Sequence, residues 1–294
     1  MKLATYRDGD RLAVGVVVAD RIVDLSTGAR GYEDMIALLR GGDGALEVAR
    51  SRPASEEGRP LADVELWAPI PRPGKFLGIG LNYAEHAAET GREPPRHPTV
   101  FAKMPTCVNR PGGEIVIPRV SRDVDYEGEL AFVIGRRCKN VSREEALGVI
   151  AGYTVVNDVS VRDWQRRTSQ FTLGKSFDTH GPMGPWLVTA DEVGDPHDLE
   201  IRTWVDGELR QHSNTRHLIF DVPSLVETLS TVFTLEPGDV VATGTPSGVG
   251  AAMTPPRFLE PGSKVRIEIE RVGVLENPVV SEETYAARYA PATT

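Results

Sequence analysis

Residues 123–135 read DVDYEGELAFVIG, an acidic segment that leads directly into five apolar residues. Side chains alternate along a β-strand, so an extended chain here places Asp125, Glu127 and Glu129 on one face. Neighbouring carboxylates on that face are ~6.7 Å apart at Cα, and at an effective dielectric of ~20 two such charges repel by roughly 2.5 kcal/mol. The pattern therefore indicates a bound cation; the alternative is an exposed edge strand with a solvated acidic face.

A third carboxylate, Asp158, ends the apolar segment at residues 153–156. Together with Glu127 and Glu129 it would form a set of hard oxygen ligands, which suits Mg²⁺, Mn²⁺ or Ca²⁺. Three carboxylates leave up to three positions of a six-coordinate Mg²⁺ for water and substrate, as a catalytic site requires. The alternative for Asp158 alone is an ordinary turn or cap.

Residues 82–91, NYAEHAAETG, predict a short helix that begins with an Asn82–Glu85 capping box and stops at Gly91. His86 and Glu89 are three residues apart and share a face of it. A carboxylate beside an imidazole orients the ring and raises its basicity, as a water-activating base needs. A surface pair is the alternative.

Two glycine-rich segments offer groups for an anionic substrate. Lys175, in LGKSFD at residues 173–178, would neutralise a substrate carboxylate or a developing oxyanion. Thr243 or Thr245, in the loop within residues 238–250, would offer a hydroxyl to an anionic group. The alternatives are a surface lysine and a tight structural turn.

Short strands separated by Gly and Pro dominate the chain and predict a mostly β, mixed α+β body rather than a doubly wound parallel sheet. A hairpin is expected at residues 12–19 and 21–25, and further strands at residues 75–79, 129–134, 153–159, 201–205, 240–242 and 264–269. Helices are expected at residues 32–39, 142–152 and 221–233, with a break at 41–44 and a linker at 51–60. Three prolines in residues 69–74 predict a domain boundary there. It separates a small N-terminal domain at 1–70 from the main domain at 71–285, which a tail at 286–294 follows.

The 294 residues carry a formal charge of −9, with 40% hydrophobic and 26% charged residues. This profile is globular and argues against nucleic acid as the main partner, since binding phosphates needs clustered Lys and Arg. No membrane span or signal peptide is expected. Two cysteines, 107 and 138, predict reduced thiols and a cytoplasmic location.

Five short motifs, in order across residues 75–250, resemble those of the fumarylacetoacetate hydrolase superfamily. The resemblance is to its acylpyruvase and 2-hydroxyhepta-2,4-diene-1,7-dioate isomerase-like branch. The motifs are GLNY through His86, DYEGELA at 125–131, Asn157-Asp158 with Arg162-Asp163 and Gln165, GKSFD at 174–178, and TGTP at 243–246 through Gly250.

The resemblance implies a mixed β-sandwich roll with a small N-terminal α+β domain, and a homodimer. It implies Mg²⁺ or Mn²⁺ on Glu127, Glu129 and Asp158, and His86, Glu89 and Lys175 as catalytic groups. Substrate contacts are implied for Tyr83, Arg162, Gln165, Thr245 and His180. At position 180 several relatives carry an aromatic residue, so this chain departs from the family pattern at His180, beside the implied substrate pocket.

The implied reaction is divalent-metal-dependent cleavage of a C–C bond in a small 2-oxo acid with a second carbonyl, such as an acylpyruvate, through an enolate that the metal stabilises. His86, with Glu89 behind it, would take a proton from the attacking water. The same enolate also serves keto–enol tautomerisation, double-bond isomerisation or decarboxylation of oxaloacetate-like acids. A non-catalytic binding protein is the remaining alternative, and the complete set of candidate residues counts against it.

Overall fold

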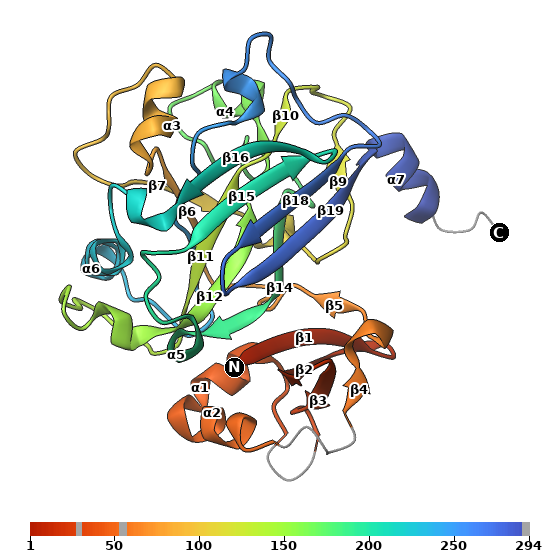
Figure 1. The fold of residues 1–294 in the computed structure, drawn as a ribbon, viewed down its shortest axis with the longest axis vertical. Coiled ribbons are helices and arrows are strands. Elements are labelled where there is room, and N and C mark those ends of the chain that lie inside the picture. Colours follow the sequence, from red (N-terminus) through yellow and green to blue (C-terminus); the bar gives the residue numbers. More distant parts are fainter. Residues whose placement is uncertain (28–30, 53–57, 290–294) are drawn as a thin grey trace.

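The computed structural model describes residues 1–27, 31–52 and 58–289, and in these segments the chain is mostly β, as predicted (Figure 1). A twelve-stranded mixed sheet runs in the order β4-β3-β2-β1-β14-β12-β11-β17-β6-β7, with β5 paired to β1 and β8 paired to β14. Its strands are β1 Lys2–Asp8, β2 Arg11–Val18, β3 Arg21–Asp24, β4 Arg59–Pro60, β5 Leu66–Trp67, β6 Phe76–Gly80, β7 Thr99–Lys103, β8 Val108–Asn109, β11 Gly128–Ile134, β12 Ile150–Asn157, β14 Gly181–Thr189 and β17 Val240–Ala242.

A second sheet of five strands packs against the large one. It runs in the order β16-β15-β18-β19-β9 and consists of β9 Ile115–Ile117, β15 Glu200–Val205, β16 Glu208–Asn214, β18 Lys264–Ile269 and β19 Gly273–Ser281. A two-stranded ribbon joins β10 Val124–Asp125 to β13 Ser160–Val161. The helices are α1 Met35–Arg40, α2 Gly42–Arg50, α3 Ala84–Glu89, α4 Arg162–Gln165, α5 Ala190–Val193, α6 Val222–Val232 and α7 Glu282–Tyr289.

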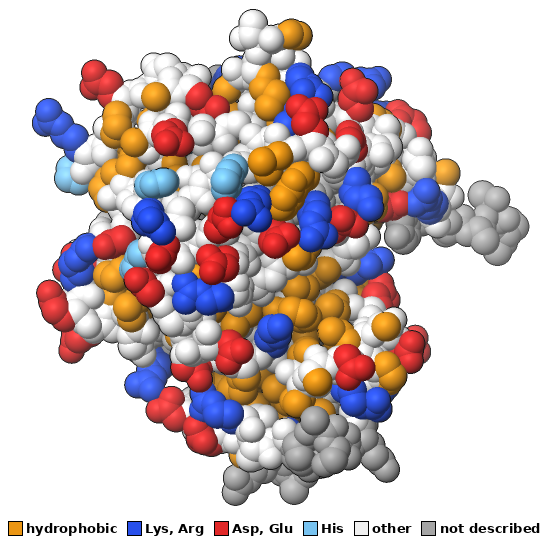
Figure 2. Space-filling model, in the orientation of Figure 1, with side chains coloured by type: hydrophobic (Ala, Val, Ile, Leu, Met, Phe, Trp, Pro, Cys, Tyr) orange, Lys and Arg blue, Asp and Glu red, His pale blue; other side chains and the backbone are white. Residues whose placement is uncertain are grey.

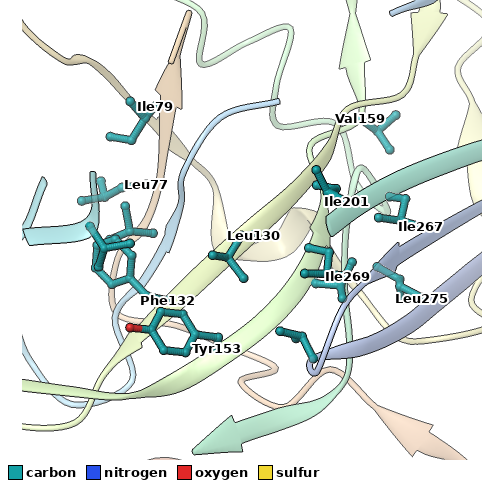
Figure 3. Packing of buried hydrophobic residues seen from close by; sticks show 14 of the residues in the cluster. Leu77, Ile79, Leu130, Phe132, Tyr153, Val159, Ile201, Ile267, Ile269 and Leu275 are labelled. Carbon is teal, nitrogen blue, oxygen red and sulfur yellow. The ribbon is translucent and has the colours of Figure 1, made fainter. Parts of the chain in front are cut away.

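Strand β11 is buried on both faces, which explains why its residues 130–134 are continuously apolar. Leu130 and Phe132 point into the core between the two sheets, where they join Ile201, Ile267 and Leu275 (Figure 3). The alternate residues of β11 belong to a second core cluster, which they share with β1, β2 and α1. The N-terminal elements therefore cover the back of the strand that leads from the acidic segment.

Most of the predicted elements are confirmed. The first hairpin forms from β2 and β3, and α6 begins at its Asp221 cap, as expected. Strand β1 also pairs with β14, so the elements on either side of the predicted domain boundary share one sheet. Figure 2 shows that hydrophobic side chains gather where the N-terminal strands meet the rest of the chain.

The break predicted at residues 41–44 is confirmed at Gly41, which is the C-cap of α1, although a second helix, α2, begins directly after it at Gly42. Two local predictions are wrong. The predicted helix at 142–152 is a single 3₁₀ turn at Ala146–Val149, after which the buried strand β12 begins at Ile150. The chain also leaves the extended strand at residues 126–127, so β10 and β11 are separate elements.

The predicted linker and the predicted tail lie partly outside the residues that the structure describes. Residues 53–57 of the predicted linker lie outside them, and residues 59–60 form β4. Residues 286–289 of the predicted tail belong to α7, and 290–294 lie outside the described residues. Both cysteines are free and buried. Among the described residues, no helix is long and apolar enough to cross a membrane.

The contact between β12 and β14 depends on a glycine. A Cβ atom at Gly152 would lie 2.1 Å from the carbonyl oxygen of Val188, and backbone has little room to move in a paired sheet. We predict that Gly152→Ala lowers the free energy of unfolding by about 1–3 kcal/mol, the usual cost of overpacking. Gly148→Ala is the control, because nothing lies within 4 Å of a Cβ there. Urea unfolding of both variants tests this, and equal stabilities would contradict it.

Candidate active site

The register of β11 and β12 brings the predicted carboxylates together. The strands are antiparallel with Gly128 opposite Asn157, so the start of one strand lies beside the end of the other. The backbone N–H of Asp158 donates to the carbonyl of Glu127 at 2.9 Å, and the Asn157 side chain accepts from the Glu127 N–H at 3.0 Å. Carboxylate oxygens of Glu127, Glu129 and Asp158 lie within 4.8 Å of one another, and all three residues are buried.

Asp125 does not join this cluster, which corrects the expectation that one strand face carries three acids. The break at residues 126–127 turns its side chain toward Arg162, whose Nε donates to Asp125 Oδ2 at 2.8 Å. The backbone N–H groups of Gly250 and Ala251 donate to the same carboxylate. Asp125 therefore anchors Arg162 and the loop at residues 250–251.

Two buried lysines compensate the charge of Asp158. Lys175 Nζ lies 2.8 Å from Glu127 Oε2 and 2.6 Å from Asp158 Oδ2. Lys103 Nζ lies 2.6 Å from Asp158 Oδ1 and also donates to the carbonyls of Lys175 and His180. Sequence reasoning missed Lys103, although in β7 it is in phase with the buried Phe101 and therefore faces inward.

The charges around Glu127 and Glu129 differ. Burial alone raises the pKa of Glu127, but Lys175 and Arg162 outweigh it and hold that pKa well below its usual value. Burial raises the pKa of Glu129 well above its usual value, and the nearby charges of Asp158 and Glu127 raise it further. The hydrogen bond to Glu129 comes from the Gly244 N–H at 2.8 Å, and no described cation lies within ion-pair distance of it. The cluster thus retains an uncompensated acid.

The predicted dyad is formed on α3. His86 Nδ1 lies 2.7 Å from Glu89 Oε1, and Glu89 Oε2 accepts from the Gly248 N–H at 2.8 Å. The second bond locks the carboxylate in place, which in turn fixes the imidazole ring. With Nδ1 engaged, Nε2 is the ring nitrogen available for proton transfer. The predicted Asn82 cap is wrong: Tyr83 occupies the N-cap position of α3 without a side-chain capping bond, and the Asn82 amide instead donates to the carbonyls of Phe220 and Thr243.

One cavity of about 840 Å³ unites most of the predicted residues. Those that line it are His86, Glu89, Glu127, Arg162, Gln165, Lys175 and Thr245. Arg162 Nη1 donates to Glu127 Oε1 at 2.5 Å and to Gln165 Oε1 at 3.0 Å. The Gln165 NH₂ group has no hydrogen-bond acceptor in the described part of the chain and is a free donor there. The Thr245 hydroxyl donates to the Gly128 carbonyl and accepts from Gln211.

Two predicted substrate contacts lie away from the cavity wall. His180 is fully buried, with Nε2 2.8 Å from the Val116 carbonyl oxygen, and burial lowers its pKa to about 4. It is therefore a neutral core residue. Tyr83 is also buried, and its hydroxyl has no hydrogen-bond partner; burial, and then the charge of Glu129, raise its pKa. Its hydroxyl lies near Glu129, and Tyr83 does not line the cavity.

Known proteins resemble this chain along most of its length. It is 42% identical over 301 aligned residues to oxaloacetate tautomerase YisK of Bacillus subtilis, covering 95% of this chain and 100% of that protein. It is 41% identical to mitochondrial oxaloacetate tautomerase fahd2 of Xenopus laevis, covering 95% and 90%.

Solved structures also match the fold. The 5-carboxymethyl-2-hydroxymuconate delta-isomerase of Mycobacterium smegmatis superposes with a TM-score of 0.78 at 38% identity, over 96% of this chain and 100% of that chain. Maleylpyruvate hydrolase of Sphingobium sp. SYK-6, in complex with manganese(II) and pyruvate, gives 0.80 at 35% identity, over 96% and 99%. The model of the fumarylacetoacetate hydrolase C-terminal domain matches residues 75–280. The chain belongs to the fumarylacetoacetate hydrolase family.

Proposed function

We propose that the protein is a divalent-metal-dependent tautomerase that interconverts the keto and enol forms of a small 2-oxo acid of the oxaloacetate type. The observation that carries this is a proton acceptor, His86, and a cationic hydrogen-bond donor, Lys175, in the wall of one cavity. Two relatives named oxaloacetate tautomerase, 42% and 41% identical over 95% of the chain, support the choice of reaction.

Tautomerisation moves one proton between carbon and oxygen. The C3–H bond breaks, its electron pair forms the C2=C3 double bond, and the oxygen on C2 takes up a proton. His86 Nε2 accepts the proton from C3, while Glu89 holds the ring and stabilises the imidazolium that forms. The reverse transfer returns the enol to the keto form.

Lys175 stabilises the charge that develops on the C2 oxygen. Burial by itself lowers the pKa of Lys175, but Asp158 and Glu127 outweigh it and raise that pKa. The side chain therefore stays an ammonium at neutral pH and acts as a donor rather than a base. Gln165, with its free NH₂ group, would bind the C1 carboxylate beside it.

The acidic cluster fits a hard divalent cation. It offers three buried carboxylates, one of which lacks a cation partner, and carboxylate oxygens are the ligand atoms that Mg²⁺ and Mn²⁺ prefer. Glu127, Glu129 and Asp158 would hold the ion, which when bound supplies Lewis-acid stabilisation of negative charge on the substrate.

Hydrolysis of a C–C bond in an acylpyruvate-like acid, the main expectation from the sequence, is the second candidate. The His86–Glu89 pair, in which His86 is buried and Glu89 half-buried, favours it, because the same geometry activates a water molecule. A maleylpyruvate hydrolase is among the similar structures. The two reactions differ in how the enolate forms: in tautomerisation the C3–H bond breaks, whereas in hydrolysis water adds to the second carbonyl and the C–C bond beside it breaks, its electron pair becoming the enolate.

One assay separates the candidates. Purified protein with Mg²⁺ or Mn²⁺ is given oxaloacetate or an acylpyruvate, and enol absorbance is followed while pyruvate is measured in parallel, with EDTA as the control. Tautomerase activity changes the enol absorbance of oxaloacetate without releasing pyruvate. Pyruvate from the acylpyruvate would instead establish hydrolysis, and pyruvate with CO₂ from oxaloacetate would establish decarboxylation. The homodimer stays a prediction, which light scattering of the same sample tests.

Glu129→Gln tests the metal centre. The substitution keeps the shape of the side chain but removes a charge that no described cation balances directly. We expect Mn²⁺ affinity to fall by about 100-fold, because loss of a residue that only orients a metal ligand already lowers metal affinity by about 10–100-fold. The metal-free variant should melt no lower than the native protein, because a buried repulsion is relieved. Titration calorimetry and thermal melting measure both, with Glu85→Gln on α3 as the control. Unchanged Mn²⁺ affinity would remove Glu129 from the site.

His86→Ala tests the proton acceptor. Loss of a positioned general base costs typically 10²–10⁴-fold, so we expect kcat for oxaloacetate tautomerisation to fall by about 100-fold or more. Glu89→Gln should have a smaller effect in the same direction, because the ring loses only its charged partner. If tautomerisation persists in His86→Ala while acylpyruvate cleavage stops, His86 serves hydrolysis alone.

A further inference from the structure

The cations deep in the cavity are already matched by protein carboxylates. Arg162 binds Asp125 and Glu127. Lys175 binds Glu127 and Asp158. Arg162 and Lys175 can orient the reacting end of a substrate. Each already forms ion pairs with protein carboxylates, so neither offers an unpaired charge to a second carboxylate of the substrate.

Two further arginines line the same cavity, and neither has an acidic partner among the described residues. Arg92 and Arg166 are exposed, and no carboxylate of the described residues forms an ion pair with either guanidinium. The only carboxylates among the described residues lining the cavity, Glu89 and Glu127, are held by other groups. This is unusual in a chain with a formal charge of −9, where acids outnumber bases. Two positive charges at the outer part of the cavity are therefore free for a ligand.

Each arginine lies about one turn after a residue of the inner site: Arg166 follows Arg162, and Arg92 follows the helix of His86 and Glu89. Arg166 follows α4, its N–H donates to the Arg162 carbonyl at 3.1 Å, and a spacing of four residues puts the two side chains on one side, about 6 Å apart along the axis. Arg92 follows α3, which carries His86. Gly91, at φ +70°, ends that helix, and the bonds from Gly91 N–H to Ala88 and from Arg92 N–H to Ala87 form a Schellman motif that fixes the turn.

We propose that Arg92 and Arg166 bind the carboxylate at the far end of the substrate and thereby select dicarboxylic 2-oxo acids over acids with an uncharged tail. The inference rests on the proposed function, since it assigns the outer half of the same site. Guanidinium groups suit this role because they form paired hydrogen bonds with a carboxylate and stay charged at any working pH. The two arginines come from different segments, which follow α3 and α4, and both line the cavity.

The test compares oxaloacetate with its 4-methyl ester, which enolises at the same carbons but lacks the distal charge. For the wild-type protein we expect kcat/KM to be at least about 10-fold higher for the diacid, since a hydrogen bond to a charged group typically gives that factor. Arg92→Gln and Arg166→Gln should each lower kcat/KM for the diacid by about 10-fold, mainly through KM, and leave the ester unchanged. The KM for the diacid should also rise with salt in the wild type and much less in the double variant.

The chain offers matched controls for both positions. Arg167 is the neighbour of Arg166 but stacks on Trp164 and pairs with Asp163, and it is absent from the cavity wall. Arg96 lies four residues after Arg92 and is likewise outside the wall. Arg167→Gln and Arg96→Gln should leave both substrates unaffected.

The outcomes separate this inference from the proposed function. If the wild type converts diacid and ester equally well, or if the arginine variants slow both substrates alike, the inference is wrong while the tautomerase activity stands. If the wild type converts neither substrate in the presence of Mg²⁺ or Mn²⁺, the proposed function itself fails. A wild-type preference for the diacid that survives in the double variant would assign the selection to other residues.

Discussion

The burial of three carboxylates at one point is the constraint on which the rest of the site depends. Like charges in a poorly solvated environment repel strongly, and an unpaired buried charge costs several kcal/mol. Cations from three separate segments form ion pairs with these carboxylates: Lys103 at the end of β7, Arg162 on α4 and Lys175 in a loop. Their positions are set by the acids they neutralise, so the acidic cluster organises the cavity wall.

The similar proteins are named as tautomerase, isomerase and hydrolase, so one scaffold serves several reactions. On the proposed function, the inner residues handle the 2-oxo acid end that these reactions share. The fate of the enolate then depends on groups farther out, namely the His86–Glu89 pair on α3 and the arginines beyond it. On the further inference, the arginines in the outer part of the cavity select the substrate.

Sequence reasoning failed where tertiary contacts outweigh local pattern. Residues 123–129 look like one strand, but the chain breaks at 126–127 because Asp125 is drawn to Arg162 and to backbone N–H groups of a distant loop. Asn82 looks like a helix cap, yet its amide binds Phe220 and Thr243, far along the chain. Residues 150–152 look like the end of a helix but enter β12, since that strand is needed between β11 and β14.

The sequence by itself determined the mostly β class, the first hairpin, the strand at β11 and the residues of the acidic cluster and the dyad. These follow from short-range patterns: alternation, apolar runs, and acids placed where a strand should not carry them. Only the tertiary structure decided that Asp125 serves Arg162, that Lys103 holds Asp158, that His180 lies in the core, and that two unpaired arginines face the cavity. The reason is physical: compensation of buried charge depends on distances between segments far apart in the chain, and no local pattern records those distances.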